Sequence, residues 1–449
     1  MWVNSMKNKK NNALSLTIIL SLLALVVGVV CGYFIPKYLN NNAYLKDLSL
    51  PKNKDAYLIN NDVVLNNNLK FDNNDYELSI EYYDLDGKKL EKIDNTKLSE
   101  YIVKYSLNEE NIKIEYISVI KIVEKLFDDL EITLLMLDND KAGDSIYIKA
   151  GDIDILIDAG STKSSFSYIS SYLDGVDGTT HSYCEDGILE YVIATHADKD
   201  HIVCFPDIFE KYECKTIIDF ARSDKDTEVY KNYLDARSEE VKNGAVHYTA
   251  LECFNEENGA KRIYELGDGI TMEILYNYYY DHDSSGNENL YSVCTLFKRG
   301  EDQFLLTGDL EAKGEKYLVE RYPDLGHCYF YKSGHHGSYT GSTLDLLNLI
   351  TPDVVACSCV AFTTEYTKDL DNVFPSKATI ENYVKANVKH FYVTSQKADN
   401  DKGWLPANGN ITIYGIGDTL GVKCSNSNED FYNTDAFPIF SEYRTWDNK

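Results

Sequence analysis

The chain has 449 residues, of which 44% are hydrophobic, so it has room for two or three domains and a sizeable core. This composition excludes wholesale disorder. Asp and Glu number 72 against 44 Lys and Arg, a formal net charge of −28, which argues against a broad nucleic-acid-binding surface because such surfaces neutralise phosphates with basic side chains.

The first predicted element is an uncharged segment between Lys10 and Lys37. Its residues 14–34 are long enough for one membrane-spanning helix, which needs about 20 apolar residues. A cleaved signal peptide is the alternative, but the run is long and no small-residue cleavage site follows it. Lys7 and Lys9 in front predict a single-pass cell-membrane anchor with the catalytic domain outside the cytoplasm. The unpaired cysteine spacing favours the opposite orientation, since exported proteins tend to pair their cysteines or avoid them.

We take residues 1–36 as the cytoplasmic tip and anchor, and residues 37–130 as a linker or a small α+β module or stalk. In this second region, alternating residues 76–83 followed by Asp86 and Gly87 predict a β-hairpin. Residues 98–105 and 117–130 look helical or mixed. No chemistry is indicated here.

Strands and helices alternate along residues 131–425, and residues 426–449 form a tail. The order predicts an α/β fold in which two sheets pack face to face and helices cover both sides. Apolar runs predict strands at residues 132–137, 145–149, 153–157, 191–194, 216–220, 290–297, 303–306, 329–331, 354–357 and 390–393, with a hairpin at 263–275. Amphipathic runs predict helices at residues 166–173, 226–241, 312–322, 344–350 and 377–386.

The densest group of potential metal ligands directly follows the predicted strand at residues 191–194. The sequence THADKDHI supplies His196, Asp198, Asp200 and His201. In such a loop His196 and Asp198 can face one ion, and the pair beyond the bend can serve a second. A surface loop with two chance histidines is the alternative, but the whole chain has nine histidines.

Three other segments deliver titratable side chains where a predicted strand ends. The segment IDILIDAG ends in Asp158, QFLLTGDLE delivers Asp309, and YKSGHHGS delivers His335 and His336. The carboxyl ends of strands are where α/β sheets place their sites. Buried charged groups need partners, and metal ions supply them.

The motifs ILIDAG, THADKDHI, FLLTGDLE and HHGS, in this order, resemble the metallo-β-lactamase superfamily. More narrowly, they resemble the hydrolase domain of the bacterial competence DNA-uptake (ComEC-type) proteins. The segment LDNDKAGDSIYI, which contains Asp144, and residues 287–293, NENLYSV, match further motifs of that branch. The resemblance covers residues 131 to 424 and implies an αββα four-layer sandwich.

The resemblance also implies two divalent metal ions, Zn²⁺ with Mn²⁺ as the alternative, which would activate a water molecule and stabilise developing negative charge. Either histidine of the HHGS motif fits the last ligand position, and we expect the first to bind metal and the second to contact the substrate. The expected metal ligands are His196, Asp198, Asp200, His201, Asp309 and His335. The expected catalytic residues are Asp200, Asp309 and His336. Asp158, Asp144 and Lys332 are expected to contact and orient the metal ligands, and Lys332 could also contact a phosphate of the substrate.

The departures from the superfamily pattern concern the first ion. Asp198 stands where the commonest motif has a histidine, which makes this site richer in oxygen. A separate histidine ligand has no clear counterpart, although His247 and His282 lie in the right interval. Phe374 stands where competence proteins tend to have another histidine. The first site is therefore expected to be incomplete or filled by water and substrate.

These features predict a membrane-anchored phosphodiesterase that acts on nucleic acid or on cell-wall phosphodiesters such as teichoic acid. A hydrolase of another ester or thioester is an alternative, because the fold does not fix the substrate. A catalytically weak, competence-related accessory or binding protein is a second alternative. The sequence indicates no protein partner.

Overall fold

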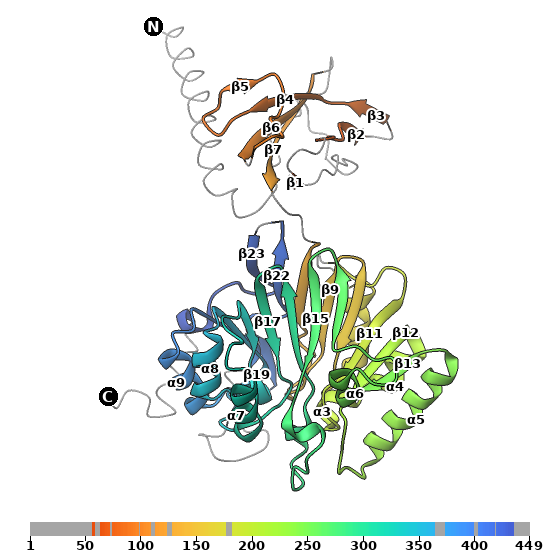
Figure 1. Ribbon diagram of the computed structural model, residues 1–449. Helices are drawn as coiled ribbons and strands as arrows, with labels where there is room; N and C mark the ends of the chain where they lie inside the picture. The colour runs from red at the N-terminus through yellow and green to blue at the C-terminus, as the bar shows by residue number, and fades with distance from the viewer. Residues whose placement is uncertain are drawn as a thin grey trace. The chain divides into compact units, whose positions relative to one another are not determined.

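A computed structural model of the chain describes residues 56–58, 63–71, 74–97, 99–108, 113–123, 128–176, 182–363, 373–398, 403–417 and 419–434. The chain divides into two compact units, Met1–Leu126 and Phe127–Lys449 (Figure 1). We call them the N-terminal unit and the C-terminal unit. Every motif residue named above lies in the C-terminal unit.

The described part of the N-terminal unit consists of strands, without a helix. The prediction of helical or mixed structure at residues 98–105 and 117–130 was therefore wrong for the described residues. Every second residue of this segment, Tyr101, Val103 and Tyr105, packs into a small apolar core, as expected for a strand with a period of two. On the opposite face Lys104 pairs with Glu115 of the neighbouring antiparallel strand. The predicted turn at Asp86 and Gly87 is confirmed, since it joins two antiparallel strands. The strands are β1 (Ala56–Leu58), β2 (Asn68–Phe71), β3 (Asn74–Glu77), β4 (Ser79–Tyr83), β5 (Lys89–Leu90), β6 (Ser99–Asn108) and β7 (Lys113–Val123), with the main sheet in the order β1-β7-β6-β4-β5.

Two eight-stranded sheets form the centre of the C-terminal unit. The first has the order β13-β12-β11-β10-β9-β8-β22-β23, and the second has the order β14-β15-β16-β17-β18-β19-β20-β21. The first sheet contains β8 (Leu130–Leu134), β9 (Ile146–Ala150), β10 (Ile153–Ile157), β11 (Ile188–Ala194), β12 (Glu213–Asp219), β13 (Val246–Thr249), β22 (Ile411–Ile416) and β23 (Thr419–Cys424). The second contains β14 (Ile263–Gly267), β15 (Ile270–Leu275), β16 (Cys294–Arg299), β17 (Asp302–Leu306), β18 (Phe330–Lys332), β19 (Val354–Ala361), β20 (His390–Lys397) and β21 (Trp404–Pro406).

Helices lie on both outer sides of this pair of sheets, as Figure 1 shows, so the unit has the predicted layered α/β architecture. The helices are α2 (Ser165–Leu173), α3 (Lys199–Ile202), α4 (Phe205–Lys211), α5 (Glu228–Asn243), α6 (Ala250–Asn255), α7 (Ala312–Arg321), α8 (Leu344–Ile350) and α9 (Lys377–Lys385). Short 3₁₀ turns are η1 (Tyr278–Tyr280), η2 (Glu288–Tyr291), η3 (Gly334–Gly337) and η5 (Phe431–Asn433).

Two apolar clusters hold these layers together. One joins side chains from both sheets with side chains of α2, α4 and α5, such as Ile169, Phe205 and Tyr233. The other joins the outer face of the second sheet to α7, α8 and α9. Strand β19 packs against apolar side chains on both faces, and all of its residues are buried. A strand covered on both faces is expected to have a largely apolar sequence without alternation. The described cysteines are all buried and unpaired, as expected for small hydrophobic side chains.

Parallel pairing brings the sequence motifs to one edge of the fold. In the first sheet β10, β11, β12 and β13 are parallel, and in the second sheet β17, β18, β19 and β20 are parallel. Asp158 follows β10, His196 follows β11, Asp309 follows β17 and His335 follows β18. Because carboxyl ends of parallel strands meet at one edge, these side chains are gathered by topology.

The expected membrane anchor at residues 14–34 lies outside the described residues. Among the described residues, no helix combines the length and apolar character needed to cross a bilayer.

The C-terminal unit should fold without the N-terminal unit, because it contains both sheets and both of the large apolar clusters. A domain of roughly 300 residues buries about 75% of the surface of its unfolded chain, which is enough for independent stability. Residues 127–449, expressed alone, should unfold in one cooperative thermal transition measured by circular dichroism. A fragment that shows no such transition, while the full chain does, would contradict this prediction.

Candidate metal centre

The carboxylate of Asp158 fixes the loop that follows β11. Asp158 comes directly after β10, and its side chain is fully buried. Its Oδ1 accepts the backbone N–H of Thr195 at 2.8 Å, while its Oδ2 accepts the Thr195 hydroxyl at 2.7 Å and the Nδ1–H of His201 at 2.8 Å. One carboxylate thus accepts three hydrogen bonds from one loop. Carboxylates that accept the Nδ1–H of a histidine in this way orient histidine ligands in metal sites.

Two glycines let neighbouring loops touch the backbone of α3. A Cβ on Gly160 would lie 2.0 Å from the carbonyl oxygen of Asp200, and a Cβ on Gly143 would lie 2.9 Å from it. The N–H of Ala159 donates to the carbonyl of His201 at 2.7 Å. Any larger residue at Gly160 would therefore push Asp200 and His201 out of place.

Three fully buried histidines each keep a proton on Nδ1 and turn Nε2 toward the site. The Nδ1 of His336 lies 2.8 Å from the carbonyl oxygen of Ser358, and the Nδ1 of His201 lies on the Asp158 carboxylate, so both nitrogens donate. The hydroxyl of Thr195 gives its only hydrogen to that carboxylate and therefore accepts from the Nδ1 of His196 at 3.1 Å. Each imidazole, when neutral, thus presents an Nε2 lone pair.

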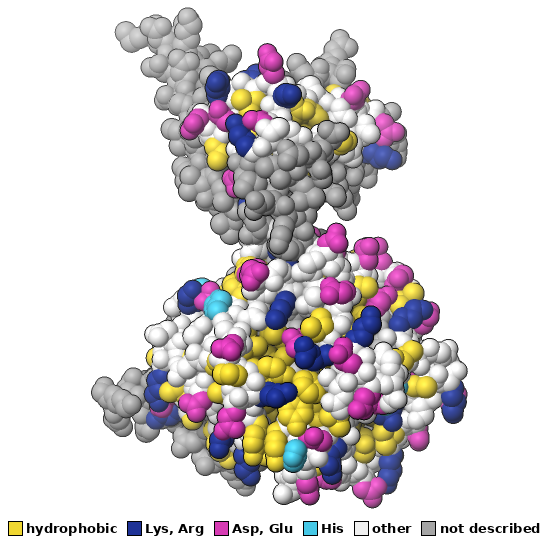
Figure 2. All heavy atoms as spheres, in the orientation of Figure 1, with side chains coloured by type: hydrophobic (Ala, Val, Ile, Leu, Met, Phe, Trp, Pro, Cys, Tyr) yellow, Lys and Arg dark blue, Asp and Glu magenta, His cyan; other side chains and the backbone are white. Residues whose placement is uncertain are grey.

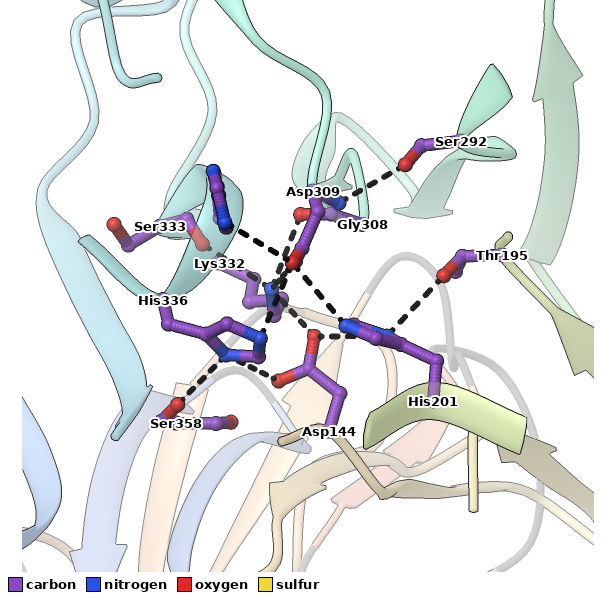
Figure 3. Close-up of polar contacts among 12 residues, drawn as sticks. Asp144, Thr195, His201, Ser292, Gly308, Asp309, Lys332, Ser333, His336 and Ser358 are labelled. Atoms are coloured by element: carbon purple, nitrogen blue, oxygen red, sulfur yellow. Dashed lines mark hydrogen bonds and ion pairs between the residues drawn. The ribbon is translucent and has the colours of Figure 1, made fainter. Parts of the chain in front are cut away.

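The side chains of His201, Asp309 and His336 converge around one point (Figure 3). The Nε2 atoms of His201 and His336 each lie 3.2 Å from Oδ2 of Asp309. The Nε2 of His336 also lies 3.6 Å from Oδ2 of Asp200. Donor atoms at about 2.0–2.2 Å from a shared zinc ion lie roughly 3–3.5 Å from one another, so these separations fit one ion.

A second, smaller set of donors lies beside the first. The Nε2 of His196 is 3.6 Å from Oδ2 of Asp198, and the rings of His196 and His201 are 4.1 Å apart. Asp198 is the N-cap of α3, so its backbone is extended while Asp200 and His201 lie within the helical turn. Asp200 and His201 therefore project from the helical turn, whereas His196 and Asp198 precede it.

The charges of this cluster shift the pKa values of its members. Burial alone would raise the pKa of Asp309, but the charges of His336 and His201 outweigh it and hold this pKa well below the ordinary value. Burial likewise opposes a charge on His336, but Asp309 and Asp144 outweigh it and raise the pKa of His336 to about 10. The pKa of His201 is raised well above its usual range, since Asp309 and Asp158 outweigh burial.

The two histidines of the HHGS motif have different places. The Nε2 of His335 is 4.0 Å from Oδ2 of Asp309, and the side chain is 21% exposed, whereas His336 is fully buried among the donors. Both residues have left-handed backbone angles, with φ of 45° and 53°, which is rare and costly outside glycine. These distances favour His336 as the ligand and place His335 at the mouth, the reverse of the expected assignment.

Asp144 and Lys332 form a buried ion pair behind the histidines. The Nζ of Lys332 lies 2.6 Å from Oδ2 of Asp144, and the side chains of both residues are 1% exposed. Asp144 faces the Nδ1 side of His336, at 3.5 Å, and not its Nε2 side. Lys332 also donates to the carbonyl of Gly308 at 3.1 Å. A lysine enclosed in this way supports the site from within and does not meet a substrate, in contrast to the phosphate contact that the sequence suggested.

The other residues considered from the sequence have partners of their own. His247 contacts Asp219 at 2.8 Å, and His282 stacks on Tyr278 with 3.7 Å between ring centres. Phe374, where competence proteins tend to have a histidine, packs its ring 5.8 Å from that of His335.

The donor set fits divalent metal ions. His201, Asp309 and His336 offer ligand atoms that lie within 4.8 Å of one another, all from buried side chains; Asp144 lies within the same distance, but its carboxylate is paired with Lys332. Among the described atoms, Nε2 of His196, Nε2 of His336 and Oδ1 of Asp309 are buried and form no hydrogen bond. Buried polar atoms without partners are costly, and a metal ion bound by nitrogen and carboxylate oxygen would satisfy them.

Curated proteins with similar sequences are competence and recombination proteins. ComE operon protein 3 of Bacillus subtilis is 23% identical over 172 residues, which cover 38% of this chain and 20% of the relative. Recombination protein 2 of Haemophilus influenzae is 38% identical over 71 residues, covering 16% of this chain and 9% of the relative. These matches confirm the predicted resemblance to the competence DNA-uptake proteins. Competence protein ComA of Neisseria gonorrhoeae is 32% identical over 91 residues, 20% of this chain and 13% of the relative.

The chain spans a fifth or less of the length of these competence-type relatives. No family model matches it. Similar solved structures include a metallo hydrolase from Ignicoccus hospitalis, with 12% identity, a TM-score of 0.34 and coverage of 63% of this chain and 98% of that one. The zinc-bound PqqB of Methylobacterium extorquens has 13% identity, a TM-score of 0.33 and coverage of 56% and 84%. The diiron β-hydroxylase CmlA of Streptomyces venezuelae has 11% identity, a TM-score of 0.34 and coverage of 60% and 53%.

Some residues of the site were not found from the sequence. Thr195 and Glu311, whose Oε1 lies 3.4 Å from Nδ1 of His335, lie inside the motifs THADKDHI and FLLTGDLE, so their places in these motifs were a usable signal. Ser358 contributes a backbone carbonyl, which leaves no trace in the side-chain pattern. Lys225 pairs with Asp198 from a charged loop that resembles any exposed segment, and nothing in its sequence marked it.

Metal binding should release protons at neutral pH. The raised pKa values of His201 and His336 mean that both rings carry a proton on Nε2 in the metal-free protein, and a metal ion must replace it. Calorimetric titration with Zn²⁺ at pH 7, in buffers of different ionisation enthalpy, should show release of about two protons. Affinity should fall as the pH is lowered. Heats that do not depend on the buffer would contradict these protonation states.

Proposed function

We propose that the C-terminal unit is a dinuclear metal-dependent hydrolase whose substrate is a phosphodiester. The observation that supports this most directly is the convergence of two histidine Nε2 atoms on one carboxylate oxygen of Asp309, with His196 and Asp198 alongside. Two imidazole nitrogens around one carboxylate oxygen fit one ion, and the neighbouring pair of His196 and Asp198 offers donors for a second.

In this proposal the residues divide into two sets. Asp200, His201 and His336 would hold one ion together with Asp309, whose Oδ2 faces both rings, and His196 and Asp198 would hold the other. When bound, such ions supply an activated water and stabilise negative charge on the reacting group. Zn²⁺ suits the imidazole ligands, and Mn²⁺ suits the carboxylates.

The protein's own groups orient and protect these ligands. Asp158 and Ser358 hold the rings of His201 and His336 through their Nδ1–H groups. Lys332 balances the buried charge of Asp144 and lies 3.7 Å from Oδ1 of Asp309. The side chains of Asp198, Asp200 and His335, by contrast, are 28%, 21% and 21% exposed, so the described residues leave this mouth open to water.

A phosphodiester suits this site better than a β-lactam, because the carboxylates make it rich in oxygen, which favours ions that grip phosphate oxygens. The net charge of −28 favours short substrates or single phosphodiester links over a long polyanion. On the face drawn in Figure 2, Lys and Arg are scattered among acidic side chains and form no basic stripe. Cell-wall phosphodiesters such as teichoic acid, or short nucleic acid, are the substrates we propose.

Asp309→Asn should remove both metal and activity. The change keeps the shape of the side chain but removes the charge that lies against both histidines. Loss of outer-shell partners alone costs about 10–100-fold, so loss of this ligand should lower turnover at least about 100-fold. Metal content per chain by mass spectrometry and turnover should fall together. Asp302→Asn, at the start of the strand β17 that precedes Asp309, is the matched control and should change neither. Full activity of Asp309→Asn, or of wild type in the presence of a strong chelator, would contradict the assignment of a metal centre.

The substrate class is tested by comparing chromogenic substrates. Metal-loaded protein should release nitrophenol from bis(4-nitrophenyl) phosphate and should leave a chromogenic cephalosporin intact. Single-stranded DNA should be cleaved more slowly, because repulsion from a polyanion opposes binding. Cephalosporin turnover without diester cleavage would overturn the substrate class and leave the metal site unaffected.

We also propose that residues 14–34 anchor the chain in the cell membrane, with the C-terminal unit outside. The support is the uncharged apolar run and the lysines in front of it. The full chain should be recovered in the membrane fraction, and a chain without residues 1–36 should not. Protease added to intact protoplasts should digest the C-terminal unit, whereas protection would show that it faces the cytoplasm.

A further inference from the structure

Lys225 brings a positive charge to the mouth of the metal centre. It lies in the loop between β12 and α5, and its Nζ pairs with Oδ1 of Asp198. The other oxygen of Asp198, Oδ2, is the one that lies 3.6 Å from Nε2 of His196. One carboxylate thus serves two tasks at once, because one oxygen faces the metal donors and the other holds the lysine.

Hydrogen bonds hold the loop that carries Lys225. The N–H of Asp224 donates to Oε2 of Glu288 at 3.3 Å, and the hydroxyl of Tyr291 donates to Oδ2 of Asp224 at 3.0 Å. Both partners are buried in η2, Glu288 with 5% and Tyr291 with 0% exposure. Next in the chain, the N–H of Lys225 donates to the hydroxyl of Ser223 at 3.1 Å. The position of the lysine is therefore set by the fold.

The environment keeps Lys225 charged and accessible. Its side chain is 33% exposed, and Nζ has three hydrogens, of which Asp198 needs one. The carboxylate of Asp198 on one side and solvent on the other favour the charged ammonium form of Lys225 over the neutral amine. Lys332, by contrast, is enclosed; it forms an ion pair with Asp144 and donates hydrogen bonds to two carbonyl oxygens.

We propose that Lys225 is the anion-recognition residue of this active site, where its ammonium group binds a charged non-bridging oxygen of the substrate's phosphate next to Asp198. The inference rests on the proposed phosphodiester chemistry and adds a residue that decides between charged and neutral substrates. No bond is made or broken by Lys225.

The experiment measures binding of inorganic phosphate to metal-loaded protein by calorimetry, together with diester turnover and metal content. Lys225→Ala should weaken phosphate binding about tenfold and raise KM for the diester by a similar factor, because one charge-assisted hydrogen bond is lost. The value of kcat and the metal content should change little. Lys225→Arg should retain most of the binding, and turnover of a neutral nitrophenyl ester should not depend on residue 225.

Lys231→Ala is the matched control, since it removes one positive charge from the same region, where Lys231 pairs with Asp226 on the surface. It should bind phosphate as wild type does. Unchanged phosphate binding by Lys225→Ala, or a wild type that binds no phosphate, would overturn the inference. A fall in metal content of Lys225→Ala would also overturn it, because the lysine would then act only through Asp198. If wild type binds phosphate through Lys225 but cleaves no diester, the proposed function fails and the anion site stands.

Discussion

The burial of Asp309 is the constraint on which the rest of the site depends. Its carboxylate is 2% exposed and must be balanced, because a buried charge that loses its partner costs about 3–5 kcal/mol. Two histidines and Lys332 surround it; His201 follows the end of β11, and His336 and Lys332 come from the end of β18, while Asp309 itself follows β17. The parallel order of strands in both sheets is what brings these ends together, so the topology and the electrostatics of the site require each other.

The outer groups decide which atom each histidine presents. A carbonyl or an ionised carboxylate can only accept, so Ser358 and Asp158 force Nδ1 of their histidines to donate and leave Nε2 for a ligand. The hydroxyl of Thr195 donates its single hydrogen to Asp158, so it can only accept from His196, and Nδ1 of His196 must also donate. One buried carboxylate therefore sets the tautomers of two histidines. This is the reason that the segment IDILIDAG belongs to the site although Asp158 faces no substrate.

Most of the C-terminal unit could be predicted from its sequence, because its strands are short apolar runs that end in motif residues. Strand β10 has the predicted bounds, and α8 does as well. Strands β6 and β7 were missed because apolar and aromatic residues occur on both of their faces, which obscures the period of two. Sequence order alone could not separate His335 from His336, since the left-handed backbone at both residues decides which ring turns inward. The place of Lys225 beside Asp198 could not be predicted either, because a lysine in a charged loop is not part of any sequence motif.

The net charge of −28 and a site for an anion are compatible because electrostatic range is short. At physiological ionic strength the Debye length is about 8 Å, so acidic side chains scattered over the surface act weakly on a group at the mouth of the site. Lys225, beside Asp198, acts at contact distance. A small phosphodiester meets mainly this local field, whereas a long polyanion must also pass the surrounding acidic side chains. The same charge distribution is therefore compatible with the proposed single phosphodiester link and opposes an extended nucleic-acid groove.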